Sequence, residues 1–190
     1  MSRNLTSGRR RRLLQGAAVG AGALGLGLYL GHGRSTPEAP SPAAEAAVEQ
    51  LWTLTLPDAQ GQSVALSTYA GRLCLVNFWA TWCPPCVEEM PELSALHAEL
   101  SGEGLAMLGI GIDSPSRITD FSAKSPVTYP LLVAGMSGTE LARALGNTSG
   151  ALPFTVLITA RGQIAYRYLG RVKIDAVRTL ALDLLRRPKT

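Results

Sequence analysis

Two kinds of apolar pattern alternate along most of the chain. Nearly continuous apolar runs, such as 73–79 and 105–112, predict strands that are covered on both faces of a sheet. Segments in which apolar residues recur every three or four positions, such as 84–100, predict helices with one buried side. In full, the pattern predicts strands at 51–56, 63–66, 73–79, 105–112, 131–134, 154–159 and 163–169, and helices at 84–100, 115–124, 138–145 and 173–186.

Turn sequences join two pairs of these strands into hairpins. The first is Pro-Asp-Ala-Gln-Gly at 57–61, and the second is Ala-Arg-Gly at 160–162. Between them, strands alternate with helices, and a hairpin and a helix close the chain. This order indicates an α/β fold, a three-layer sandwich with a mixed central sheet and an N-terminal β-hairpin.

The N-terminal part does not fit this pattern. Arginines at 9–12 precede an apolar, glycine-rich stretch at 13–30, and a Pro- and Ala-rich stretch follows at 31–47. This is the order of an export signal. Eighteen helical residues reach ~27 Å, close to the ~30 Å hydrocarbon core of a bilayer. We therefore expect a signal or anchor at 1–30, a flexible linker at 31–47 and a folded domain at 48–190.

Whether the signal is cleaved remains open at this point. The small-x-small triplet at 44–46 lies far beyond the apolar stretch, and the one at 21–23 lies inside it. These positions favour an uncleaved inner-membrane anchor at 13–30, with the arginines inside and the domain on the extracytoplasmic, periplasmic side. The run at 10–14 resembles a twin-arginine signal, and general export is the equal alternative.

The basic charge belongs to this segment and not to the domain. Six of the 18 basic residues lie at 1–34, where there is no acid, so residues 35–190 carry 12 basic and 14 acidic side chains, a net of about −2. A nucleic-acid partner is therefore not expected.

The sequence Trp82-Cys83-Pro84-Pro85-Cys86 lies where an apolar strand ends and a helix begins. Two cysteines on the first turn of a helix are close enough to form a disulfide. The unpaired N–H groups of the helix start favour a thiolate. Cys83, near the N-cap and partly exposed, is the expected nucleophile, and the more buried Cys86 is the expected resolving thiol. Pro84 and Pro85 fit the first turn and remove two donors from Cys83, which favours a reductant.

A zinc site is the main alternative for this motif. A structural site needs four ligands, and the remaining candidates are Cys74, His32 and His97, which form no second pair. Two buried structural cysteines are a poorer fit, because Cys83 lies at an element boundary. We expect a redox-active disulfide, no metal and no other cofactor.

The segment at 77–86, Asn-Phe-Trp-Ala-Thr-Trp-Cys-Pro-Pro-Cys, resembles the active site of the thioredoxin superfamily, in particular its TlpA/ResA-like branch of exported disulfide reductases. The resemblance covers about 50–187 and implies a thioredoxin fold. Leu152-Pro153-Phe154-Thr155 is similar to the cis-proline loop that faces the dithiol in this superfamily. It implies that Pro153 shapes the substrate groove and that the backbone of Leu152 pairs with a client peptide.

The same resemblance assigns roles to Asn77 and Glu89. Asn77 stands where thioredoxin has a buried aspartate, and it cannot titrate. Glu89 aligns with an acidic residue that ResA-like proteins keep near the dithiol, which implies a general base for Cys86. The alternative is an ordinary solvated glutamate, like its neighbour Glu88.

Five other residues receive simpler interpretations. We expect Cys74 to be a buried, inert thiol. Trp79 and Trp82 are expected to form walls of the site. His97 is expected on a partly exposed helix face without a catalytic role, and Asp113 at a turn or helix cap.

The resemblance implies a monomeric oxidoreductase that reduces protein cysteines, for cytochrome c or oxidase copper-site maturation. Its implied partners are client proteins, a membrane thiol carrier of the DsbD type, and the membrane itself through the N-terminal segment. An oxidant or a peroxidase of the same fold and a copper(I) chaperone are the alternatives. The peroxidase motif is absent from 77–83, and no histidine follows His97.

Overall fold

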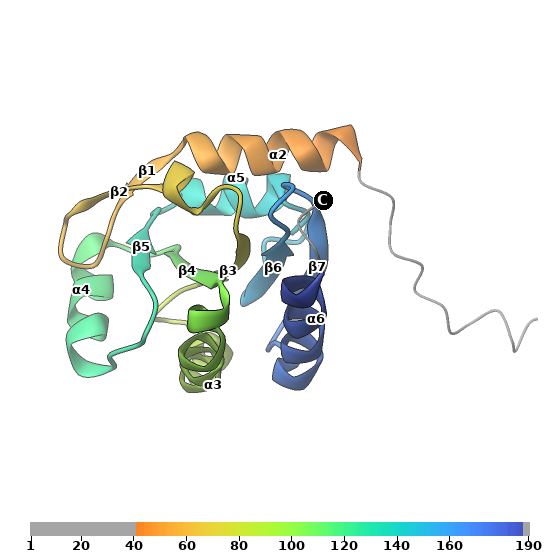
Figure 1. Ribbon diagram of the computed structural model, residues 1–190. Coiled ribbons are helices and arrows are strands. Elements are labelled where there is room, and N and C mark those ends of the chain that lie inside the picture. Colours follow the sequence, from red (N-terminus) through yellow and green to blue (C-terminus); the bar gives the residue numbers. More distant parts are fainter. Residues whose placement is uncertain (1–40, 188–190) are drawn as a thin grey trace, which may run out of the picture. The chain divides into compact units, whose positions relative to one another are not determined.

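The computed structural model describes residues 41–187 (Figure 1). The predicted signal or anchor at 1–30 and most of the predicted linker lie outside the described residues. Within 41–187, no helix combines the length and apolarity needed to cross a bilayer. In chain order, the elements are α2 (Pro42–Thr53), β1 (Thr55–Pro57), β2 (Ser63–Ala65), the 3-10 helix η1 (Leu66–Tyr69), β3 (Leu73–Trp79), α3 (Pro84–Leu100), the 3-10 helix η2 (Ser101–Glu103), β4 (Leu105–Gly111), α4 (Pro115–Lys124), β5 (Leu131–Val133), α5 (Ser137–Ala144), β6 (Phe154–Ile158), β7 (Ile164–Leu169) and α6 (Ile174–Arg186).

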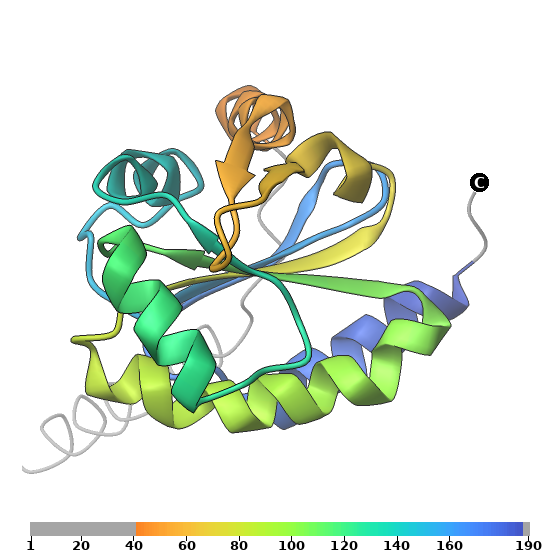
Figure 2. The same ribbon diagram turned by 90° about the vertical axis from the view of Figure 1, so that its left-hand side faces the viewer.

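The five main strands form one mixed sheet in the order β5-β4-β3-β6-β7. β3 and β4 are parallel, as are β4 and β5, while β6 runs antiparallel to both β3 and β7. Helices α2 and α5 cover one face, and α3 and α6 cover the other (Figures 1 and 2). The predicted three-layer α/β sandwich of the thioredoxin type is confirmed.

The central strand β3 divides the core into two layers. All seven of its residues are buried. Cys74, Val76 and Phe78 pack on the side of α2 and α5, whereas Leu75 and Trp79 pack on the side of α3 and α6. Successive strand side chains point to opposite faces of the sheet. Trp79, the last residue of β3, therefore faces the layer that contains α3.

The predicted N-terminal hairpin is present as β1 and β2, which pair antiparallel from Thr55↔Ala65 to Pro57↔Ser63. The Asp58 carboxylate accepts backbone hydrogen bonds from Gln60 at 2.9 Å and Gln62 at 2.8 Å. An aspartate that binds backbone N–H groups ahead of it stabilises a tight turn.

The prediction was wrong just before this hairpin. A strand was expected at 51–56 and a linker up to 47, but α2 extends to Thr53. Ser41 caps the helix and accepts a hydrogen bond from Ala44 N at 3.2 Å. Val48 and Leu51 are buried one helical turn apart, so the helical period extends to the end of α2. The Leu-Trp-Thr-Leu sequence at 51–54 is compatible with a strand as well, which explains the wrong prediction.

Candidate active site at the start of helix α3

Cys83 and Cys86 form a disulfide at the start of α3, with their Cα atoms 5.3 Å apart. Cys83 is the N-cap residue, and Pro84 and Pro85 occupy the first helical turn as expected. The Cys86 N–H donates to the Cys83 carbonyl at 3.0 Å. The helix start therefore holds both sulfurs within bonding distance.

Cys83 is more buried than the sequence suggested, whereas Cys86 is buried as expected. Cys83 is 5% exposed and Cys86 is fully buried. The prediction overestimated the exposure of Cys83, because in the disulfide the Cys86 sulfur covers part of the Cys83 sulfur. The predicted order still holds, since Cys83 alone of the two reaches solvent.

Glu89 lies in α3 one turn after Cys86 and is fully buried. Its Oε1 accepts a hydrogen bond from Asn77 Nδ2 at 2.7 Å, and its Oε2 accepts one from Val172 N at 2.8 Å. Asn77 Nδ2 also donates to Thr155 Oγ1 at 3.0 Å. A polar layer thus lies between the sheet and α3, beneath the dithiol.

Burial raises the pKa of the Glu89 carboxyl above its usual value, against the opposing effect of the hydrogen bonds from Val172 and Asn77. The neighbouring Glu88 is exposed and lies 3.7 Å from Arg171 Nη1. The alternative of a solvated Glu89 is therefore wrong. A buried carboxyl whose pKa is raised, next to a specific polar partner, is typical of functional sites.

Gly109 makes room for aromatic side chains beside this layer. It pairs with Asn77 in the β3–β4 register. A Cβ at Gly109 would lie 3.1 Å from Tyr129 Cε2 and 3.3 Å from Trp79 Nε1. Burial raises the pKa of the Tyr129 hydroxyl, and so does the negative charge of Glu89. Tyr129 is therefore close enough to Glu89 to sense its charge.

The Leu152–Pro153 peptide bond is cis, as the resemblance implied. The Pro153 carbonyl accepts a hydrogen bond from Gly170 N at 2.8 Å, and β6 begins at the next residue, Phe154. Leu152 is half-buried, and within 41–187 neither its N–H nor its carbonyl makes a hydrogen bond to another backbone group.

The two tryptophans have different positions. Trp82 is 59% exposed directly before Cys83, as a wall of the site would be. Trp79 is fully buried and packs on Phe121, with ring centroids 5.0 Å apart. Trp79 is the last residue of β3 and faces the α3 layer. It therefore belongs to the core that packs under the dithiol and not to an exposed wall of the site.

Sequence reasoning missed the link between Asp113 and Thr81. The Asp113 Oδ2 accepts hydrogen bonds from Thr81 Oγ1 at 2.5 Å and from Thr81 N at 3.2 Å. Its Oδ1 accepts one from Ser114 N at 2.7 Å, and these bonds lower the pKa of the carboxyl despite its burial. The sequence did offer one signal: Thr81 and Asp113 follow two predicted strands, and parallel neighbours end at the same edge of a sheet. Asp113 thus anchors the loop that carries Trp82 and Cys83.

Cys74 and His97 lie apart from this chemistry. Cys74 is a free thiol on the opposite face of the sheet, and burial raises its pKa to about 12. The Nδ1 of His97 hydrogen-bonds Thr128 Oγ1 at 3.0 Å on the outer side of α3. Within 41–187, no three His, Cys, Asp or Glu side chains come together as metal ligands.

Comparison with known proteins places the chain in a family. The model of the AhpC/TSA family matches residues 48–167. The thiol-disulfide oxidoreductase ResA of Halalkalibacterium halodurans is 30% identical over 123 residues, which cover 64% of this chain and 68% of that protein. ResA of Geobacillus thermodenitrificans is 30% identical over 57% of this chain, and the match covers 61% of that protein, less than two thirds of its length.

Solved structures agree. A secreted thiol-disulfide isomerase from Corynebacterium glutamicum has a TM-score of 0.63 and 25% identity, covering 72% of this chain and 86% of that one. A thioredoxin family thiol:disulfide interchange protein from Chlorobium tepidum has a TM-score of 0.61 and 22% identity. It covers 80% of this chain and 99% of that one, and it supports the fold.

Proposed function

Because the chain belongs to the AhpC/TSA family and is a ResA/TlpA-like oxidoreductase of the thioredoxin superfamily, we propose that it reduces disulfides in client proteins through Cys83 and Cys86. The observation that carries this proposal is the Cys83–Cys86 pair at a helix start with a buried carboxyl, Glu89, one turn beyond it. A dithiol needs a nucleophile, a resolving thiol and a proton acceptor, and these three groups supply them.

The first step is attack by the Cys83 thiolate on one sulfur of a client disulfide. A bond forms between Cys83 and that sulfur, the client S–S bond breaks, and the second client sulfur leaves as a thiolate that takes up a proton. Cys83 is the attacking group because it caps the helix, whose free N–H groups stabilise the anion, and because it is the cysteine with solvent access.

The second step is attack by Cys86 on the Cys83 sulfur. Cys86 first gives its proton to the Glu89 carboxylate, and the mixed disulfide then breaks to release the reduced client. The protein is left with a Cys83–Cys86 disulfide, the state seen here. Two electrons from a dithiol donor return it to the reduced form.

Asn77 fits both protonation states of Glu89. Its amide N–H₂ donates to the carboxylate, as observed. If the Asn77 side-chain amide rotated by half a turn, its oxygen would accept a hydrogen bond from the O–H of the protonated carboxyl, since an amide offers both a donor and an acceptor. An asparagine therefore supports proton exchange at Glu89 without titrating itself.

The client binds next to the cis-proline loop in this proposal. The Leu152 backbone is available for strand-like pairing with an extended peptide, and Pro153 follows it directly. Trp82 offers an exposed aromatic surface before Cys83. Its ring would contact the residues on either side of the client cysteine.

The finer assignments rest on the family and the N-terminal sequence. We propose clients of the cytochrome c or copper-site maturation type, re-reduction by a DsbD-type membrane carrier, and a location on the extracytoplasmic side of the inner membrane through 13–30. A reductase is needed there, because thiols required for haem or metal would otherwise be oxidised. The active protein is proposed to be a monomer.

Trapping the mixed disulfide tests the proposal. The reduced full chain carrying Cys86→Ser, mixed with a peptide containing an intramolecular disulfide, should accumulate a covalent adduct at Cys83, identified by mass spectrometry. Cys83→Ser should give none. Turnover of hydrogen peroxide without reduction of peptide disulfides would instead indicate the peroxidase, and retention of copper(I) without either would indicate the chaperone.

A further inference from the structure

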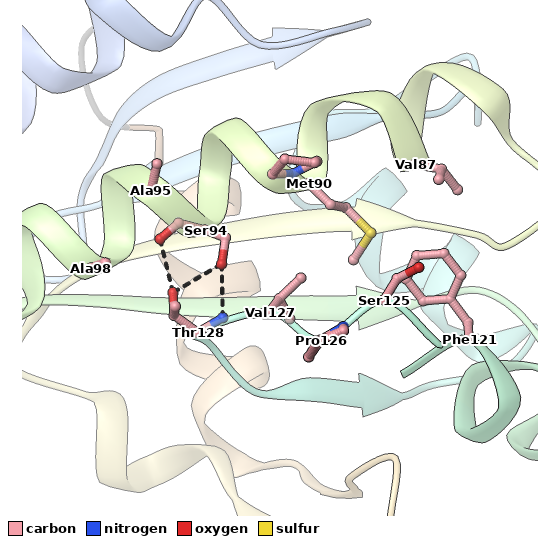
Figure 3. A pocket seen from close by; sticks show the side chains of 11 residues that line it. Val87, Met90, Ser94, Ala95, Ala98, Phe121, Ser125, Pro126, Val127 and Thr128 are labelled. Carbon is pink, nitrogen blue, oxygen red and sulfur yellow. Dashed lines mark hydrogen bonds between the residues drawn. The ribbon is translucent and has the colours of Figure 1, made fainter. Parts of the chain in front are cut away.

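A groove of about 500 Å³ runs along the outer side of α3 (Figure 3). One wall is α3, with Pro91, Ala95 and Ala98, and the other wall is the segment that links α4 to β5, with Pro126 and Val127. Met90 lies between the walls (Figure 3). Met90 is only 2% exposed and belongs to the core beneath the groove, so it forms part of the groove floor.

Two of the lining residues connect the groove with the redox motif. Val87, which lines it, directly follows the resolving cysteine Cys86. Phe121 lines it as well, and also lines a second hollow, of about 410 Å³, that contains Trp82. Phe121 therefore borders both hollows, and the hollow at Trp82 is also lined by the charged residues Arg117, Asp120 and Lys124.

The groove is held open by hydrogen bonds. Thr128 N donates to Ser94 Oγ at 2.9 Å, and Thr128 Oγ1 donates to the Ser94 carbonyl at 2.9 Å (Figure 3). These bonds fix the linking segment to α3. Because these bonds preform the cleft, binding would not carry the cost of ordering the linking segment.

Its length and chemistry fit an extended apolar peptide. The eleven-residue rise from Val87 to Ala98 is ~17 Å at 1.5 Å per helical residue. An extended chain covers that distance with about five residues. Apart from Ser94, Ser125 and Thr128, the lining residues are apolar, and none carries a charge.

Pro91 adds one polar feature at the end near the dithiol. It has no N–H, so the carbonyl of Val87 lacks the donor that position 91 supplies in an uninterrupted helix. This carbonyl can accept a hydrogen bond from the peptide backbone just beyond the disulfide.

We infer that this groove binds an apolar segment of the client, about five residues long, next to the cysteine being reduced. The inference rests on the proposed function and adds a second contact to it, on the side of the dithiol formed by α3 and α4. Phe121, which the groove shares with the hollow at Trp82, argues for the client over a second copy of the chain. The site therefore selects clients by flanking apolar residues as well as by the disulfide.

Charged substitutions in the groove test this. Ala95 and Ser125 are exposed on opposite walls, so Ala95→Glu and Ser125→Glu place a carboxylate there without disturbing the core. Ala46→Glu is the matched control, because Ala46 is an exposed alanine on α2, the helix that covers the other face of the sheet. The readout is the second-order rate constant with which each reduced full-length chain reduces a disulfide.

Three probes are needed: a peptide disulfide with five apolar residues beside the cysteine, the same peptide with serine and glycine there, and glutathione disulfide. Both groove variants should reduce the apolar peptide about tenfold more slowly than the wild type, equivalent to ~1.4 kcal/mol of lost contact. The other two probes and Ala46→Glu should show no change.

Equal rates for the wild type and both groove variants on the apolar peptide would overturn the inference and leave the proposed function intact. A change in sedimentation-determined oligomeric state without a change in rate would overturn it in favour of a second copy. Failure of the wild type to reduce any of the three probes would instead reject the proposed function.

Discussion

At the residue scale, the chemistry depends on where the proton of Glu89 goes. The carboxyl is surrounded by donors from Asn77 and Val172 and is closed off from water, yet it follows the resolving Cys86 by one helical turn. Its raised pKa makes it a better base than an exposed glutamate.

Glu89→Gln should slow the release of client from the Cys83 mixed disulfide by about 10²-fold or more, because Gln cannot accept the Cys86 proton. The wild-type rate should also rise with pH as Glu89 ionises, and the variant should lack that rise. Acid quenching followed by mass spectrometry measures the adduct directly. Glu88→Gln, the exposed neighbour, is the control. Equal rates in all three proteins would remove Glu89 from the mechanism.

The same raised pKa predicts a pH dependence of stability. The folded state holds the Glu89 proton more tightly than the unfolded state, whose value is near 4.5. Below that pH the carboxyl is protonated in both states, and as pH rises through the folded pKa the folded state loses stability. The wild type should therefore lose unfolding free energy relative to Glu89→Gln between about pH 4 and pH 7. Urea unfolding of both proteins at about pH 4 and pH 7 measures this. An equal change in unfolding free energy for the two proteins would show that burial does not raise the pKa of Glu89.

At this scale, most of the candidate site could be predicted from the sequence. Cys83, Cys86, Glu89 and Pro153 were identified from a local motif or a family resemblance. The link from Asp113 to Thr81 was not, because it joins residues 32 positions apart whose proximity depends on which strands are neighbours.

At the element scale, helix α2 shows where pattern reasoning fails. Its first turns look like linker, and its last turn looks like a strand, since Pro, Ala, Glu and Thr give no single period. The structure resolves this through Ala47, Val48 and Leu51, which are buried on the sheet face shared with α5. The longer strands and helices were predicted closely because their apolar runs and spacings are unambiguous.

Leu51→Ala should destabilise the protein by about 2–5 kcal/mol, the usual cost of removing a fully buried leucine side chain. Gln50→Ala, an exposed neighbour on the same helix, should change stability by less than about 0.5 kcal/mol. Urea unfolding of the full chain measures both. A loss of under 1 kcal/mol for Leu51→Ala would mean that this turn behaves as a tether and not as part of the core.

At the scale of the whole molecule, the sheet topology positions the chemistry. β3 and β4 are parallel, so their carboxyl ends deliver Trp79, Asp113 and the Cys83 loop to one edge. β6 returns antiparallel from Pro153, which brings the cis-proline loop to the same edge. No local pattern encodes this convergence; the family resemblance predicted it, and the fold provides it.

The central claim is that the Cys83–Cys86 pair donates electrons to client disulfides. The most direct test is its equilibrium reduction potential, measured in the full chain against a glutathione or dithiothreitol redox series. Cys74 will not interfere, because it is buried on the far face of the sheet. The account predicts a value more negative than about −200 mV, towards the −270 mV or so of thioredoxin. A value above about −180 mV, towards the roughly −120 mV of a strong oxidant, would contradict it.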